Sequence, residues 1–286
     1  MDPVEELIRA QPGLSLMLAA LGLVVGSFLN LVIHRLPKMM EAQWARDCAE
    51  YRDEPLPSEE PLSLAYPGSQ CPHCNTKIKP WQNIPVVSYL VLHGRCASCE
   101  ASISIRYPLV EIITALIWVI CGLSFGVSNA LAGALLLTAV LVTLTAIDLD
   151  HQLLPDSLTL PLLWIGLLLN MMGTFTSLES ALLGAVFGYL SLWSVYWLFK
   201  IVTSKEGMGY GDFKLLAALG AWFGLAALPT IVLLSSLVGA TLGLTLILTG
   251  KQSRETPMPF GPFLAGAGLI HLLYPNALLG WITGGI

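Results

Sequence analysis

Charged residues are scarce in this 286-residue chain, at 12% of the sequence, whereas soluble domains carry about 25%. Hydrophobic residues make up 55%, and the mean hydropathy is +0.72. The formal net charge of −5 is small, and the sequence lacks the basic stripe that binds nucleic acid. We therefore expect a membrane protein that contacts lipid and no nucleic acid.

A cleavable signal peptide is not expected either, because the chain begins with acids (Asp2, Glu5 and Glu6) where a signal would be basic. The first apolar run is therefore expected to stay as a helix. About 20 apolar residues cross a bilayer, and backbone groups in lipid must be paired internally. The sequence thus predicts an all-α polytopic protein with about eight transmembrane helices. The expected segments are 13–34, 109–125, 129–147, 157–173, 178–199, 212–226, 228–249 and 259–282.

Lys and Arg gather on one side of this predicted topology. Eight of them lie in 35–107, others lie in the loops after the fifth and seventh segments, and Arg9 alone lies opposite. The positive-inside rule makes the rich side cytoplasmic, and a bacterial inner membrane is the simplest setting. We expect three parts: a first transmembrane helix (1–34), a cytoplasmic domain (35–107) and a transmembrane domain (108–286).

Two acidic junctions fall on the same predicted face, one around Asp148 and one ending at Asp212. Ionisable groups at the edge of hydrocarbon are costly and indicate function. Two neighbouring carboxyls do not both ionise readily, so one keeps a proton while the other is charged. Such a pair can deprotonate water and protonate a peptide carbonyl. Asp148 and Asp212 are therefore candidates for such a pair.

Structural roles and a different function are also compatible with these acids. Asp156 and Asp212 begin predicted helices, where Asp is a favoured N-cap. Asp148 ends a helix, where an anion opposes the helix dipole, so capping does not account for it. The pair also suits a cation- or proton-coupled transporter, and a metal-dependent scaffold without chemistry is a further alternative.

Four of the six cysteines form two C-x2-C pairs, Cys71–Cys74 and Cys96–Cys99, separated by 21 residues. Four thiolates suit tetrahedral Zn²⁺ in a closed structural site. Redox dithiols and simple reduced cysteines remain alternatives, while a cytoplasmic location disfavours stable disulfides. We expect a small zinc-binding cytoplasmic domain between the first two transmembrane helices, with the acidic, Pro-containing stretch 39–70 irregular.

Gly209-Tyr-Gly-Asp212 has the Gly-x-Gly-Asp pattern of membrane aspartic proteases, and it follows Asp148-Leu-Asp150-His-Gln-Leu-Leu-Pro-Asp156. With further motifs over most of the chain, this ordered set resembles the type IV prepilin leader peptidase/N-methyltransferase family. The further motifs are Gly26-Ser-Phe-Leu-Asn30, His34-Arg35-Leu-Pro37, Asn83-Ile-Pro85, Arg106-Tyr-Pro108 and Pro259-Phe-Gly-Pro262.

The resemblance implies that Asp148 and Asp212 are the catalytic pair of an aspartic endopeptidase. Its substrates would be type IV prepilins and type II secretion pseudopilins, whose short basic leaders are cut after a Gly at the cytoplasmic face. Bifunctional members then N-methylate the new N-terminus with S-adenosylmethionine. Gly94 matches a family glycine linked to methyl transfer, although a turn glycine beside a metal knuckle accounts for it equally well.

Two further positions carry expectations. Glu111 is predicted in the first turn of the second transmembrane helix, where a helix N-terminus favours an anion and where it could meet a basic leader. His34 and Arg35 are predicted to snorkel toward the membrane interface from the end of the first helix.

Overall fold

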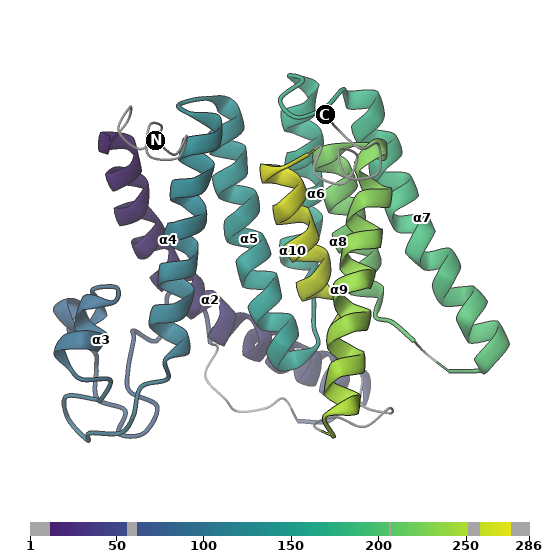
Figure 1. Ribbon diagram of the computed structural model, residues 1–286. Helices are drawn as coiled ribbons and strands as arrows, with labels where there is room; N and C mark the ends of the chain where they lie inside the picture. The colour runs from purple at the N-terminus through teal and green to yellow at the C-terminus, as the bar shows by residue number, and fades with distance from the viewer. Residues whose placement is uncertain (1–11, 56–61, 206, 251–257, 276–286) are drawn as a thin grey trace. The chain divides into compact units, whose positions relative to one another are not determined.

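The computed structural model describes residues 12–55, 62–205, 207–250 and 258–275 (Figure 1). Within these ranges the chain is helical, and its β-pairing is limited to two isolated bridges, one for each pair of cysteines. The all-α prediction is therefore confirmed. The chain forms two compact units, Met1–Gly126 and Val127–Ile286, and each is described by itself.

The first unit consists of α2 (Pro12–Tyr51), the 3-10 turn Pro80–Asn83, α3 (Val87–Val91) and α4 (Arg106–Phe125). Helices α2 and α4 pack together through glycines. A Cβ added to Gly22 or Gly26 would lie 2.6 Å from the Cα of Ala115 or Glu111. Small residues at this spacing let two helix backbones approach closely, as is common in membranes.

Helix α2 continues 17 residues beyond the predicted end at residue 34, so the expectation of irregular chain from 39 is wrong as far as Tyr51. Ala, Met, Glu, Gln and Arg dominate this extension, and these are strong helix formers. Arg35 does not snorkel: its side chain is buried and donates to the carbonyls of Ser63 (2.8 Å) and Pro67 (2.6 Å). Residues 56–61 lie outside the described ranges.

The second unit is built around the short helix α8 (Tyr210–Phe223), which is labelled in Figure 1. In α8 nearly every side chain from Asp212 to Trp222 is buried, as expected for a helix that is apolar all round. Helices α6, α7 and α10 pack against α8, and α10 also packs against α5 and α9. The elements are α5 (Asn129–His151), α6 (Asp156–Met171), α7 (Leu178–Thr203), α8 (Tyr210–Phe223), the 3-10 turn Leu225–Ala227, α9 (Leu228–Leu248) and α10 (Gly261–Leu273).

Asn170 fixes the end of α8 that lies away from Asp212. Its Nδ2 donates to the carbonyls of Ala221 and Trp222, each over 2.9 Å. Its Oδ1 accepts from the N–H groups of Phe175 and Thr176, each over 3.0 Å. One buried amide therefore ties α6, α8 and the turn before α7 together, which fixes the depth of α8 in the unit.

Five helices are long and apolar enough to cross a membrane: α2, α4, α5, α7 and the stretch 225–248 that contains α9. Helices α6, α8 and α10 have 16, 14 and 13 residues. At about 1.5 Å per residue they are shorter than the roughly 30 Å of a hydrocarbon core. A helix lies at each of the eight predicted positions, but eight complete transmembrane spans are not confirmed. The predicted segments 157–173 and 212–226 end two and three residues beyond α6 and α8, and the part of segment 259–282 after residue 275 lies outside the described ranges.

Candidate active site

Asp148 lies in the last turn of α5 and is 4% exposed. The helix continues to His151 and ends where Gln152 adopts a left-handed conformation (φ 52°). The Gln152 N–H donates to the Asp148 carbonyl over 2.9 Å, which satisfies one of the carbonyls left over at the helix end. The carboxylate itself is thus held inside the unit by the final turn of a buried helix.

Asp212 is the third residue of α8 and is 6% exposed. The N-cap of this helix is Gly209, and the structure shows no side-chain hydrogen bond that caps the helix. The prediction that Asp212 is the N-cap is therefore wrong, because Asp212 lies three residues after the cap.

Asp148 and Asp212 are both buried, and the two acids lie within range of each other's charge. Leu154 shows how their segments meet. A Cβ on Gly211 would lie 2.7 Å from Leu154 Cβ, and one on Gly261 would lie 3.1 Å from Leu154 Cδ2. The end of α5, the start of α8 and the start of α10 therefore converge around one leucine, with both acids at the junction.

Asp148 also has a specific backbone partner. The N–H of Gly261, the first residue of α10, donates to Asp148 Oδ2 over 3.0 Å. The motif Pro259-Phe-Gly-Pro262 is conspicuous in the sequence, but the sequence does not indicate its role. A Gly-Pro pair at a helix start indicates a backbone that approaches another group closely, without indicating which group.

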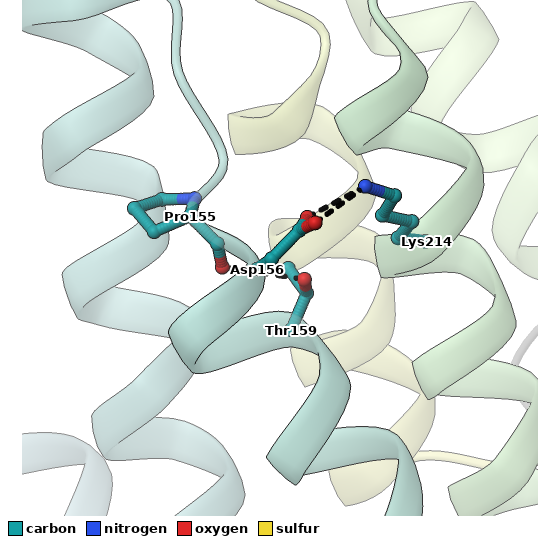
Figure 2. A network of polar contacts seen from close by, with 4 residues as sticks. All are labelled: Pro155, Asp156, Thr159 and Lys214. Carbon is teal, nitrogen blue, oxygen red and sulfur yellow. Dashed lines mark hydrogen bonds and ion pairs between the residues drawn. The ribbon is translucent and has the colours of Figure 1, made fainter. Parts of the chain in front are cut away.

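Asp156 and Lys214 form an ion pair beside this junction (Figure 2). Lys214 Nζ lies 2.7 Å from Asp156 Oδ1 and 2.8 Å from Oδ2, which joins α6 to α8. Asp156 is the first residue of α6, whose N-cap is Pro155. Asp156 is therefore not the predicted N-cap; its carboxylate reaches across to the neighbouring helix, because the adjacent ammonium group offers a charge-assisted hydrogen bond.

Glu111 lies in the second turn of α4, so its predicted place in the first turn is wrong. It is 6% exposed, and its Oε2 accepts from the Val86 N–H over 2.7 Å. Val86 immediately precedes α3 and has φ 58°. The buried carboxylate thus holds an unusual backbone turn within the first unit.

The four predicted metal ligands come together in the first unit. The sulfurs of Cys71, Cys74, Cys96 and Cys99 all lie within 4.8 Å of one another. Cys71 Sγ and Cys99 Sγ are 3.8 Å apart. Zn–S bonds of about 2.3 Å in a tetrahedron place the sulfurs about 3.8 Å apart, so the cluster fits a tetrahedral metal ion.

The two cysteine pairs sit on matching backbone turns. In the first, Asn75 N–H donates to Cys71 O (2.9 Å). In the second, Glu100 N–H donates to Cys96 O (3.0 Å). Asn75 and Glu100 both have positive φ, 55° and 57°. The same knuckle therefore occurs twice, and each copy directs two sulfurs toward a common centre.

Two thiols of the cluster have pKa values well away from the ordinary value. A hydrogen bond with the Thr76 side chain is the main cause that lowers the pKa of Cys74 to about 6. At Cys99 a backbone hydrogen bond with Ala101 acts downward, but burial and the neighbouring thiols raise the pKa to about 12. Four close thiolates repel each other without a cation among them, which agrees with a metal-binding arrangement.

Gly94 lies between α3 and the second knuckle with φ 68°. Its N–H donates to Tyr89 O (2.9 Å), and its carbonyl accepts from Ile103 N–H (2.7 Å). A Cβ here would lie 3.0 Å from the Tyr89 ring. These contacts account for the glycine as a turn residue, and its link to methyl transfer stays a prediction.

Comparisons with known proteins agree with this arrangement. Residues 20–125 match the family described as Bacterial Peptidase A24 N-terminal domain, and residues 135–244 match the Type IV leader peptidase family. The chain is 57% identical to a prepilin leader peptidase/N-methyltransferase of Pseudomonas aeruginosa, over 90% of this chain and 89% of that protein. A protein with the same name from Aeromonas hydrophila is 55% identical, over 96% of this chain and 96% of that protein. Another from Burkholderia pseudomallei strain 1026b is 47% identical, over 95% of this chain and 89% of that protein. No solved structure matches.

The likeness thus spans both compact units, and the two matched regions contain the cysteine knuckles and the acidic junction respectively. The chain is a member of the type IV leader peptidase family.

Proposed function

We propose that this chain removes leader peptides from prepilins by aspartic proteolysis and N-methylates the N-terminus that cleavage exposes. The names of its relatives support both activities. The observation that supports the peptidase assignment is that two buried acids 64 positions apart in sequence, Asp148 and Asp212, lie within range of each other's charge. A structural role would not require two buried acids this close.

The chemistry follows from the pairing. Two adjacent carboxyls share one proton, because both cannot be charged at low cost. The charged member deprotonates a water, and the protonated member donates to the carbonyl oxygen of the peptide bond. The tetrahedral intermediate then collapses and releases the leader. A Cβ added to Gly209 would come no closer than 3.9 Å to Asp212 Oδ2, so this glycine gives an extended peptide room to approach, whereas Gly211 packs against Leu154.

The finer features of the reaction are part of the same proposal. Cleavage follows a Gly of a short basic leader, and the substrates include type II secretion pseudopilins as well as type IV prepilins. The Lys and Arg distribution supports a cytoplasmic position for both the acid pair and the cysteine cluster. Long apolar helices and family membership support a bacterial inner membrane. The three-part division at residues 34 and 107 stays a prediction.

We propose that the metal held by the four cysteines is zinc, in a structural site. Four sulfur ligands leave no open position for a substrate, and the ion would tie the two knuckles together. S-adenosylmethionine is proposed as the methyl donor, a co-substrate consistent with the relatives' name. Its binding residues are unassigned, with Gly94 as a candidate.

The transporter alternative receives no support from the comparisons, since both the matched families and the named relatives are peptidases. A pure scaffold is equally unsupported.

The test uses purified full-length protein and a prepilin, with and without S-adenosylmethionine, and measures product mass. Cleavage and the added methyl group are then separately visible. We expect Asp148→Asn and Asp212→Asn each to abolish cleavage, because an amide can neither deprotonate water nor share the proton.

Asp150→Asn is the matched control, because it makes the same change on the same helix at an exposed position. It should cleave at close to the wild-type rate. If both of the buried-acid variants cleave normally while folding like the wild type, the peptidase assignment to this pair is wrong.

A further inference from the structure

The start of α10 supplies a donor to one of the two candidate catalytic acids. Gly261 N–H donates to Asp148 Oδ2 over 3.0 Å, although the residues are 113 positions apart. As the first residue of its helix, Gly261 has an N–H without an acceptor inside that helix. The carboxylate of Asp148 is the acceptor that the fold provides.

The neighbouring residues direct this donor to Asp148. Pro262 has no N–H, and the Phe263 N–H is used by the Phe260 carbonyl over 3.1 Å. Among the first three residues of α10, the N–H of Gly261 is therefore the donor that reaches another helix. The Gly-Pro order places one backbone donor opposite one carboxylate.

The missing side chain is also required. A Cβ on Gly261 would lie 2.6 Å from Asp148 Oδ2 and 3.1 Å from Leu154 Cδ2, so the carboxylate would have to move. Gly268, on the same helix, shows the simpler case of a packing glycine, since the three atoms nearest to its added Cβ all belong to the Leu219 side chain, the first at 2.7 Å. Gly261 combines close packing with a hydrogen bond to an acid.

Helix polarity is the reason that Asp148 needs this contact. Its carboxylate lies in the last turn of α5, where the helix dipole disfavours an anion. The N-terminus of α10 has the opposite polarity and offers an N–H. The hydrogen bond therefore stabilises an acid where its own helix does not, and it fixes the position of Oδ2.

We propose that Gly261 is a positioning residue of the peptidase. Its N–H and its missing side chain hold the Asp148 carboxylate in the position that cleavage requires. This inference rests on the proposed function, because it assumes that Asp148 takes part in cleavage. Gly261 itself need not touch the substrate.

The test compares Gly261→Ala with Gly266→Ala in the full-length enzyme acting on a prepilin. Gly266 lies on the same helix, and nothing lies within 4 Å of its added Cβ. A displacement of about 1 Å can cost roughly 100-fold in rate. We expect Gly261→Ala to lower kcat by about that factor with KM unchanged, and Gly266→Ala to match the wild type.

Two further measurements separate positioning from damage to the fold. Gly261→Ala should lower the melting temperature only modestly, because the clash is confined to one junction, and its methylation of an already cleaved pilin should stay at the wild-type value. Leu154→Ala added to Gly261→Ala removes the clash with leucine and leaves the clash with the carboxylate, so cleavage should stay low relative to Leu154→Ala alone.

The inference is overturned if Gly261→Ala keeps the wild-type kcat, or if its KM, stability and methylation fall together with kcat. It is also overturned if the double variant regains activity. Failure of the proposed function looks different: wild-type protein would not cleave, or Asp148→Asn and Asp212→Asn would cleave in the same assay.

Discussion

Gly94 has a left-handed backbone (φ 68°), and a side chain there would press on the Tyr89 ring. An L-residue in this conformation costs about 1–2 kcal/mol. We expect Gly94→Ala to lower the melting temperature and to weaken metal retention, since the residue leads directly into the second knuckle. Thermal unfolding and bound-metal content measure both effects.

The matched control is Gly68→Ala, in the same loop region, where nothing lies within 4 Å of the added Cβ. It should leave stability and metal content unchanged. A Gly94→Ala protein that keeps its stability and metal but loses methylation would show that Gly94 acts in methyl transfer itself, beyond its role in the turn.

At the scale of elements, the Asp156–Lys214 pair joins the start of α6 to α8 two residues after Asp212 (Figure 2). The side chains of Lys214 and Asp156 are 28% and 53% exposed, so the coupling should be modest, about 0.2–1 kcal/mol. We expect Asp156→Lys and Lys214→Asp each to lower stability and the cleavage rate, and the double reversal to recover part of both. A double-mutant cycle on thermal unfolding and initial rates measures the coupling.

Glu179→Lys serves as the control for charge reversal, because Glu179 is an exposed acid in the first turn of α7. Its effect should be small and should not depend on Lys214. Strict additivity of the Asp156 and Lys214 changes would mean that the ion pair contributes nothing to the junction of α6 with α8.

At the scale of the whole molecule, the cysteine cluster and the acid pair belong to different compact units. We expect Cys71→Ser to release the metal, destabilise the first unit and reduce methylation, because bound metal contributes folding free energy. Leader cleavage should be retained to a large extent. Metal analysis, unfolding and the two product masses are the readouts, and native mass measurement identifies the ion.

Cys48→Ser is the corresponding control, since Cys48 is exposed on α2 and lies outside the cluster. Loss of cleavage equal to the loss of methylation in Cys71→Ser would contradict independent roles for the two units.

Much of the architecture could be predicted from the sequence because hydrophobic run length and C-x2-C spacing are local properties. The helical class, the position of each long apolar helix and the four sulfur ligands follow from residues near one another in the chain. Helix ends were less predictable: α2 runs to Tyr51 and α5 to His151. Such boundaries depend on caps and tertiary contacts more than on composition.

The sequence alone determined that Asp148 and Asp212 are acids in apolar surroundings at helix ends, because residue type and hydropathy are written along the chain. Only the tertiary structure decided which groups the buried and interfacial acids of this chain contact. The Gly261 N–H reaches Asp148, Lys214 reaches Asp156, and Glu111 binds the Val86 N–H. Each of these contacts joins residues at least 25 positions apart. Packing within each unit decides which segments meet, and no local sequence pattern records that packing.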